Sequence, residues 1–374
     1  MPIDVDRQRQ AKEYARISHR LLALELALTT FALVAVIALG LNVWLKQNVF
    51  AITNNVWLAT FLYFAVAFVA YAVLFFPLSY YSGFVLPHHY GLSTQTRRAW
   101  IADELKGGAL GIVLGGVVIE VIYLVLRTMP GVWWLCASAF MLVFNVLLAN
   151  LAPVLIMPIF FKFKPLEDAE LVARLTALAE RAGTRVRGVF TMMLSEKTTA
   201  ANAALMGLGN TRRIVLGDTL YDKYSHDEIE TILAHELGHH VHRDIAWSLV
   251  VETALTLAGF FIADLFLRAG VALLHYESIA DLAALPLFAL ALGAFGAVTM
   301  PLGNAFSRWR ESLADAYALD ATRNAPAFIG AMEKLANQNL AEVEPERWVE
   351  YLLYSHPPIG KRIRRGEEFA KAHR

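Results

Sequence analysis

Two histidines and a glutamate close together in the sequence indicate metal-dependent hydrolysis. The segment reads His235-Glu236-Leu237-Gly238-His239. Side chains four residues apart lie on one face of an α-helix, so both imidazoles can reach a single ion, with Glu236 beside them. A zinc ion held in this way lowers the pKa of its water, and a nearby carboxylate takes the proton. The pattern therefore predicts zinc ligands at both histidines and a general base at Glu236.

A third protein ligand must come from elsewhere in the chain. Zinc peptidases with a third histidine place a glycine seven positions and a histidine ten positions after the first histidine. Here those positions hold His242 and Ile245, which excludes that class. His242 shares the face of His235 but lies about 10 Å further along the helix axis. We therefore expect His240 and His242 to be solvated or to support the ligands rather than to bind the ion.

A pair of carboxylates offers the missing ligand. Glu311 and Asp315 are four residues apart in SRWRESLADAYAL, which is predicted to be helical. One carboxylate can bind zinc while the other accepts a hydrogen bond from the free N–H of a ligand histidine. Alone, such a pair would be an ordinary surface pair facing Arg308 or Arg310. Together with the two histidines, it makes Glu311 the candidate third ligand.

The chain that must position these groups is mostly apolar. Of its 374 residues 57% are hydrophobic and only 18% are charged, against roughly a quarter charged in soluble domains. The mean hydropathy of +0.47 predicts a membrane protein. The 33 basic residues balance 33 acidic ones, which gives no indication of a nucleic-acid partner. The single cysteine, Cys136, excludes an internal disulfide and a thiolate metal cluster.

Six stretches are long and apolar enough to cross a bilayer, which requires about 20 residues. They cover residues 21–45, 56–80, 108–127, 132–160, 247–273 and 281–305. The N-terminal tail and the loop 81–107 are rich in Lys and Arg, whereas the loops 46–55, 128–131 and 274–280 are poor in them. This alternation predicts that both termini and the polar segment 161–246 lie in the cytoplasm.

The expected fold is an α-helical membrane protein whose six spans form a bundle or chamber, capped by a cytoplasmic α+β domain. We expect a membrane domain over 1–160, a catalytic domain over 161–246, two further spans over 247–305 and a second part of the catalytic domain over 306–374. Within 161–246 the pattern predicts a helix over 166–183, a strand in RVRGVFTMML and a hairpin of ANAALMG, the turn LGNT and RRIVLGD. Ser225 and Glu228 have the spacing of a capping box and begin the histidine helix.

Five segments together resemble the type I CAAX prenyl endopeptidase family, membrane zinc metalloproteases that trim the C-termini of prenylated proteins. The segments are AHELGHH (234–240), SRWRESLADAYAL (307–319), TAANAALMGLGNTRRIVLGDTL (199–220), HHYGLSTQT (88–96) and SHPPIGKRI (355–363). The similarity runs from the second span to near the C-terminus. Eukaryotic members have seven spans and this chain has six, which favours a prokaryotic member.

The resemblance implies a role for each matching residue. The zinc ligands would be His235, His239 and Glu311, an arrangement of the gluzincin type, and Glu236 would be the general base. Asp315 would orient a ligand histidine. Asn202 would lie beside the site, on the strand along which an extended substrate binds. His356 and Arg362 would stabilise the oxyanion, and the spans would enclose a water-filled chamber.

The sequence thus predicts a zinc metalloendopeptidase acting on peptides or proteins associated with the lipid bilayer. Prenylated tails and membrane proteins under quality control both remain open as substrates, and the oligomeric state is open. The expected location is the bacterial cell membrane rather than that of the endoplasmic reticulum. A transporter or channel, suggested by six spans and by the acids Glu120 and Glu252 within them, would leave the zinc motifs unexplained. A non-catalytic zinc scaffold has no support in the sequence, because each expected catalytic position is occupied.

Overall fold

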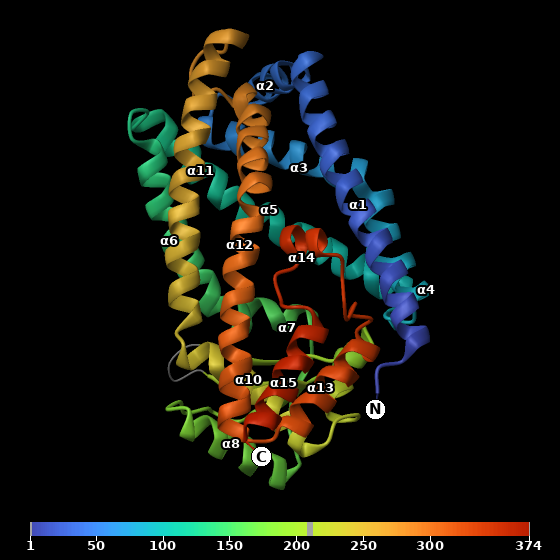
Figure 1. The fold of residues 1–374 in the computed structure, drawn as a ribbon. Helices are drawn as coiled ribbons and strands as arrows, with labels where there is room; N and C mark the ends of the chain where they lie inside the picture. The colour runs from blue at the N-terminus through green and yellow to red at the C-terminus, as the bar shows by residue number, and fades with distance from the viewer. Residues whose placement is uncertain (1, 208–211, 374) are drawn as a thin grey trace.

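Long helices form one part of the molecule, and a small sheet with shorter helices forms the other (Figure 1). The computed structural model describes residues 2–207 and 212–373, so the predicted turn LGNT at 208–211 lies outside the described residues. Both ends of the chain lie near the part that contains α8, α10, α13 and α15 (Figure 1).

Six helical segments are long and apolar enough to cross a membrane, which confirms the predicted number of spans. The first is α1 (Val5–Ala38), and the second is α3 (Val56–Tyr80), which continues through a π-helical turn, η1 (Tyr81–Val85), and α4 (Leu86–His89). The third is α5 (Arg97–Thr128), and the fourth is α6 (Trp133–Leu151), which continues through η2 (Ala152–Ile156) and α7 (Met157–Phe160). The fifth is α11 (Asp244–Leu274), and the sixth is α12 (Leu285–Thr322), which follows η5 (Leu282–Ala284).

The surfaces of these helices carry large apolar side chains. Phe31 is 72% exposed, Val73 68% and Val298 76%. Side chains of this kind on long helices fit a hydrocarbon environment better than water. The protein is therefore an integral membrane protein, as its composition predicts.

The first span differs from its predicted bounds. The stretch 21–45 is interrupted after Ala38, because Gly40 adopts a left-handed conformation with φ of 68° and a second helix, α2 (Leu41–Ile52), begins there. At its other end α1 extends back to Val5, where the side chain of Asp4 caps it by accepting from the backbone N–H of Arg7. Hydropathy alone does not show either limit, since a glycine can interrupt an apolar helix and a charged segment can extend one.

A four-stranded sheet has the order β1-β2-β4-β3. The strands are β1 (Phe163–Pro165), β2 (Val189–Met192), β3 (Ala203–Met206) and β4 (Arg213–Gly217). β2 and β4 are parallel, whereas β1–β2 and β3–β4 are antiparallel. The predicted strand and the two predicted hairpin strands are thus present, and β3 lies at one edge of the sheet.

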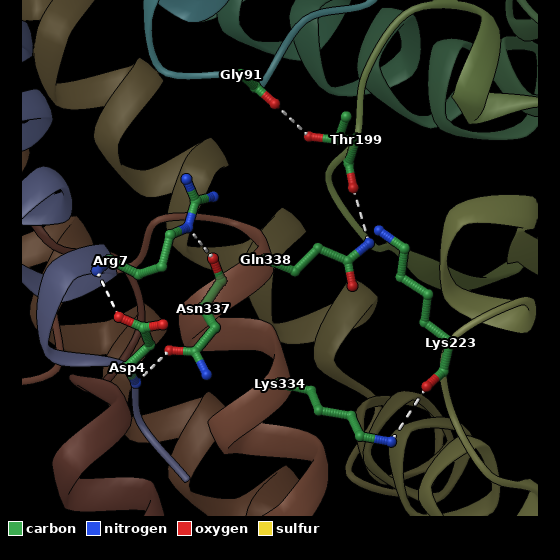
Figure 2. A pocket seen from close by; sticks show the side chains of 8 residues that line it. All are labelled: Asp4, Arg7, Gly91, Thr199, Lys223, Lys334, Asn337 and Gln338. Carbon is green, nitrogen blue, oxygen red and sulfur yellow. Dashed lines mark hydrogen bonds between the residues drawn. The ribbon is translucent and has the colours of Figure 1, made fainter. Parts of the chain in front are cut away.

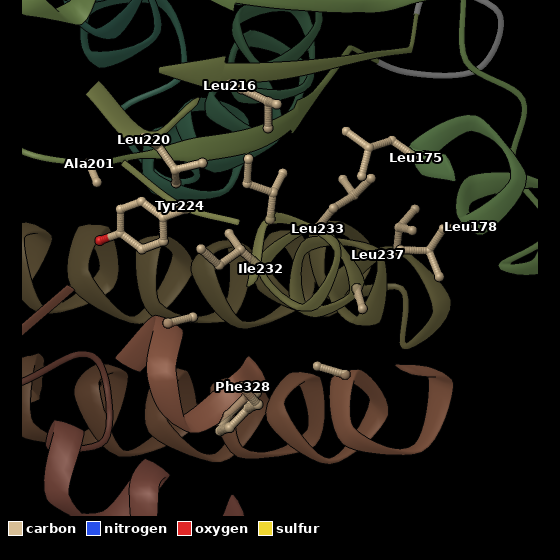
Figure 3. Close-up of a cluster of buried hydrophobic side chains, with 14 of the residues drawn as sticks. Leu175, Leu178, Ala201, Leu216, Leu220, Tyr224, Ile232, Leu233, Leu237 and Phe328 are labelled. Carbon is tan, nitrogen blue, oxygen red and sulfur yellow. The ribbon is translucent and has the colours of Figure 1, made fainter. Parts of the chain in front are cut away.

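The helix with the histidine pair, α10 (His226–Val241), lies in the core of this domain. In Figure 3, Leu216 lies on the sheet side of α10 and Leu175 on the side of α8 (Ala169–Arg181), while Phe328 of α13 (Ala325–Gln338) packs from the opposite side. Leu233 of α10 is fully buried between them. Smaller elements complete the domain: η3 (Leu194–Glu196), α9 (Asp218–Tyr221) and α15 (Ile359–Ala372). A further short helix, α14 (Arg347–Leu353), lies away from the sheet and packs against α12 (Figure 1).

No linker separates the membrane part from this domain at the later predicted boundaries. The boundary at 246/247 falls inside α11, and that at 305/306 falls inside α12. The predicted four-part division stays a prediction, but two helices run through its boundaries.

Candidate active site

The start of α10 fixes the histidine pair relative to the core. The Ser225 side chain accepts from the backbone N–H of Glu228, and the Glu228 carboxylate accepts from the backbone N–H of Ser225, so the predicted capping box is present. Ile229 and Leu233 are fully buried on the core side. With this face anchored, the rings of His235 and His239 lie 4.8 Å apart, centroid to centroid.

A close helix contact brings Glu311 to these rings. A Cβ atom on Gly238 of α10 would lie only 2.9 Å from Cα of Ala314 in α12. The glycine therefore allows the two backbones to approach each other, and Ala314 is fully buried at the contact. Glu311 lies one turn before Ala314, beside the two histidines.

The three predicted ligands converge on one point. Nε2 of His235 lies 3.2 Å from Oε2 of Glu311, and Nε2 of His239 lies 3.4 Å from Oε1. The two Nε2 atoms are 3.2 Å apart. One atom from each of the three residues lies within 4.8 Å of the others, a grouping that could hold a metal ion.

The other nitrogen of each ring is held by an aspartate. Nδ1 of His235 lies 2.9 Å from Oδ1 of Asp315, and Nδ1 of His239 lies 2.7 Å from Oδ2 of Asp244. Arg362 also approaches Nδ1 of His235, at 3.3 Å, but the carboxylate is nearer and accepts a hydrogen bond from Nδ1–H. Both rings therefore donate from Nδ1, which leaves the lone pairs of their Nε2 atoms facing each other.

This set of donors fits a metal cation. Two nitrogen lone pairs and a carboxylate point at the same place, and they repel one another unless a positive charge lies between them. Oε2 of Glu311 is buried and has no hydrogen-bond partner among the residues that the structure describes. Two imidazoles and one carboxylate, with room for water as a fourth ligand, are typical of catalytic zinc.

The surroundings also change the proton affinities of the site. Burial disfavours the charged form of His235, but the Asp315 and Glu311 carboxylates beside its two nitrogens outweigh burial and raise its pKa to about 9, so a proton and a metal cation compete for Nε2. Burial raises the pKa of the Glu236 carboxyl. A carboxylate with a raised pKa is a better proton acceptor, which suits a general base.

Each orienting aspartate has its own arginine. Asp315 is completely buried and accepts from Nη2 of Arg362 at 2.6 Å. Asp244 accepts from Nε of Arg310 at 2.7 Å. These arginines neutralise the buried carboxylates and fix their orientation, and through the aspartates they restrain the two histidine rings.

The sequence did not identify Asp244 and Arg310 as site residues. On a continuous helix, a residue five positions after His239 would lie about 140° away from it around the axis. The chain instead breaks at Arg243, which has φ of 56°, and this turn brings Asp244 back to the ring. In the sequence, the one feature that points to Asp244 is that an acidic residue stands just before a predicted span.

The remaining predicted residues lie around the same site. Nε2 of His356 is 3.2 Å from Oε1 of Glu311. Asn202 precedes β3, and a pocket of about 220 Å³ is lined by Asn202, Glu236, His356 and Arg362, among others. His242 is outside the ligand group, and its Nδ1 lies 2.8 Å from the carbonyl oxygen of Gly238.

Comparison with known proteins places this site in a family. The model described as Peptidase family M48 matches residues 165–370. The chain belongs to peptidase family M48. A second model, described as the CAAX prenyl protease N-terminal region with five membrane helices, matches residues 2–162. The predicted resemblance to the CAAX prenyl endopeptidases is therefore confirmed, and this M48 chain is a membrane metalloprotease.

Relatives of this M48 chain include bacterial and eukaryotic proteins. It is 30% identical over 362 residues to the uncharacterized metalloprotease YhfN of Bacillus subtilis (strain 168), covering 96% of this chain and 85% of the relative. It is 31% identical to CAAX prenyl protease 1 of Saccharomyces cerevisiae, over 77% of this chain and 67% of the relative. The crystal structure of S. mikatae Ste24p superposes with a TM-score of 0.84 at 25% identity, covering 97% of this chain and 89% of that one. The overall fold class is thereby confirmed.

Proposed function

We propose that this M48 protein is a zinc-dependent endopeptidase that hydrolyses peptide bonds of membrane-associated substrates. The observation that carries the proposal is the convergence of two Nε2 atoms and the Glu311 carboxylate, with both Nδ1 atoms held by aspartates. Family membership implies a metal ion, and the donor set favours zinc.

The residues of the site can each take a part in hydrolysis. Zinc, when bound to His235, His239 and Glu311, supplies a Lewis acid that polarises water and the substrate carbonyl. Glu236 accepts the proton of the attacking water and passes it to the leaving amine. His356 and Arg362 line the same pocket, and we assign to them the stabilisation of negative charge on the carbonyl oxygen.

The substrate is proposed from the names of the relatives and from the membrane setting. Relatives in several eukaryotes are named CAAX prenyl protease 1, which favours proteins with prenylated C-termini. Quality control of membrane proteins by the same mechanism is the alternative, and the similarity to an uncharacterized bacterial metalloprotease is compatible with it. We place the site on the cytoplasmic side of the membrane, because Lys and Arg residues are concentrated in the N-terminal tail and in the loop 81–107. The similarity to a Bacillus subtilis metalloprotease favours a bacterial cell membrane.

The test is a pair of matched variants of the purified full-length protein in detergent. Glu236→Gln should abolish hydrolysis of a quenched peptide and retain zinc, because it removes a base and not a ligand. Glu230→Gln is the control on the same helix, since Glu230 pairs with Arg174 away from the site. Near-wild-type turnover of Glu236→Gln would reject the mechanism. Comparative proteomics of membranes containing the wild type or the Glu236→Gln trap would then separate the two substrate classes.

A further inference from the structure

The segment that leads into β3 is held by two side-chain amides at the end of α13. Nε2 of Gln338 donates to the carbonyl oxygen of Thr199 at 2.7 Å, which Figure 2 shows. The carboxamide of Asn339 forms two bonds with Ala201: its Oδ1 accepts from the backbone N–H at 2.8 Å, and its Nδ2 donates to the carbonyl oxygen at 3.0 Å. Asn339 therefore makes the pair of bonds that a residue of a neighbouring β-strand would make.

The peptide groups along the strand point alternately to its two sides, and this alternation shows which edge Asn339 occupies. The carbonyl oxygen of Asn202 accepts from the backbone N–H of Gly217 at 2.8 Å and so points toward β4. Residues on either side of Asn202 point the opposite way. Ala201 and Ala203 therefore present their N–H and C=O groups to the open edge of β3. Within residues 2–207 and 212–373, no strand pairs with that edge.

The open edge faces the proposed metal ligands. Ala203 and Asn339 line the pocket of about 220 Å³ together with His235 and Glu236. Asn339 occupies the edge at Ala201, and the free peptide groups begin two residues later, at Ala203. The position of this backbone determines how an extended peptide would lie over the ligands.

Asn339 is itself held firmly. The next residue, Leu340, has φ of 49°, a strained conformation for a leucine, and is 4% exposed. It packs in a cluster with Ala11 of α1. Just before it, Asn337 bonds the N-terminal segment, since its Oδ1 accepts from the backbone N–H of Asp4 at 2.9 Å (Figure 2). Strain of this kind persists where the surroundings fix the backbone.

We propose that Asn339 is a positioning residue for the substrate: its carboxamide holds Ala201 and thereby aligns the free edge of β3 at Ala203 with the metal ligands. The proposal rests on the proposed peptidase function. An extended substrate would bond to the edge in its ground state and in its transition state alike. Loss of the alignment should therefore weaken binding of the substrate more than it slows the chemical step.

The test compares three variants of the full-length zinc-loaded protein on one quenched peptide. Asn339→Ala should raise KM roughly 10-fold to 100-fold, the equivalent of one or two main-chain hydrogen bonds, while kcat changes less than about threefold. Asn339→Asp keeps the acceptor for the N–H of Ala201 but loses the donor to its carbonyl, so its KM should be intermediate. Asn48→Ala is the control, because this exposed amide bonds the backbone of its own helix, α2, in the membrane part of the protein.

Amide exchange and metal content separate positioning from simple loss of structure. In Asn339→Ala the amide of Ala201 should exchange faster, while the zinc content and the protection of α10 stay as in the wild type. A fall in kcat in proportion to lost zinc, with KM unchanged in both Asn339 variants, would overturn the proposal while leaving the peptidase function intact. A wild type that binds zinc but hydrolyses no peptide would instead reject the proposed function and this role with it.

Discussion

At His235 and His239, the hydrogen bond that one ring nitrogen makes determines what the other nitrogen can bind. Asp315 and Asp244 take the Nδ1 protons, so both Nε2 atoms are free to bind a cation. The two aspartates are not on equivalent elements, since Asp315 lies within α12 and Asp244 begins α11. Asp315 reaches its histidine because it lies on the same face of α12 as Glu311, whereas Asp244 reaches its histidine because the chain turns just before it.

Glu311 and Asp315 should differ in their effect on metal release. Glu311→Ala removes a ligand, whereas Asp315→Ala removes support for a ligand, a change that typically costs about 10–100-fold in metal affinity or activity. Glu311→Ala should therefore release zinc to dilute chelator much faster than Asp315→Ala. Equal release from both variants, followed with a zinc-sensitive dye, would indicate that the third ligand lies elsewhere.

Asp244→Asn should weaken metal binding although Asp244 is not a ligand. The amide can no longer act as a charged acceptor for Nδ1 of His239, and Arg310 loses its buried partner. We expect a loss of about 10–100-fold in zinc affinity, measured by competition with a chelator of known affinity. Asp227→Asn is a suitable control because Asp227 is half-exposed and bonds Arg174 far from the rings. Unchanged affinity in Asp244→Asn would contradict the orienting role.

His356 and Arg362 should behave differently, even though both line the pocket. His356 is exposed, so His356→Phe should keep zinc and fold while turnover drops about 10²–10³-fold. Arg362→Met leaves Asp315 buried without its main partner, and should lower the thermal stability and the zinc content as well. Thermal unfolding and metal analysis of both variants check this contrast; an Arg362→Met protein as stable as the wild type would refute it.

At the scale of elements, the site depends on the contact between α10 and α12. Gly238 lets the two helices approach until a Cβ would lie 2.9 Å from the Ala314 backbone. Helix backbones cannot yield as a flexible side chain can, so the contact fixes the distance from Glu311 to the histidines.

Gly238→Ala should separate these helices. We expect a loss of about 1–3 kcal/mol in the free energy of unfolding, together with weaker zinc binding, because the added methyl group has no space. Gly303→Ala is the matched control on α12, since a Cβ there would meet no atom within 4 Å. Thermal unfolding with and without zinc distinguishes them, and equal behaviour of the two variants would contradict the packing argument.

The sequence predicts correctly those helices whose first and last residues are determined by neighbouring residues. The histidine helix begins at a capping box, and α8 ends before Gly183, which adopts a left-handed conformation with φ of 73°. The missed features depend on tertiary structure or on single backbone angles. Asp244 reaches His239 through the turn at Arg243, and Asn339 reaches Ala201 across the domain. Sequence spacing carries no information about either contact.

At the scale of the whole molecule, the N-terminal segment is attached to the domain that contains the site. Nε of Arg7 donates to the carbonyl oxygen of Asn337 at 3.0 Å, and Nε2 of Gln8 donates to that of Ala341 at 3.0 Å. Both termini therefore lie at the same end of the molecule as α10, the helix with the histidine pair (Figure 1). This arrangement agrees with the alternation of Lys and Arg between loops, which predicts a cytoplasmic end.

Single cysteines introduced at Asp4, Phe50, Pro130 and Ala370 should react from two different sides of the membrane. In a Cys136→Ala background, we expect the first and last positions to react only with reagent on the cytoplasmic side, and the middle two only from the opposite side. Intact and permeabilised cells treated with an impermeant maleimide give the readout. Reaction of either terminal position in intact cells would contradict the orientation.

The sixth span and Glu311, the proposed third ligand, share one uninterrupted helix, α12, from Leu285 to Thr322. A single residue inserted in its membrane part would turn Glu311 by about 100° around the axis, and an insertion of seven would restore its face but displace it by about 10 Å. The number of residues in this span therefore cannot change without moving Glu311 relative to the two histidines. In this protein, adaptation to a thicker or thinner bilayer must come from other helices or from tilting the whole molecule.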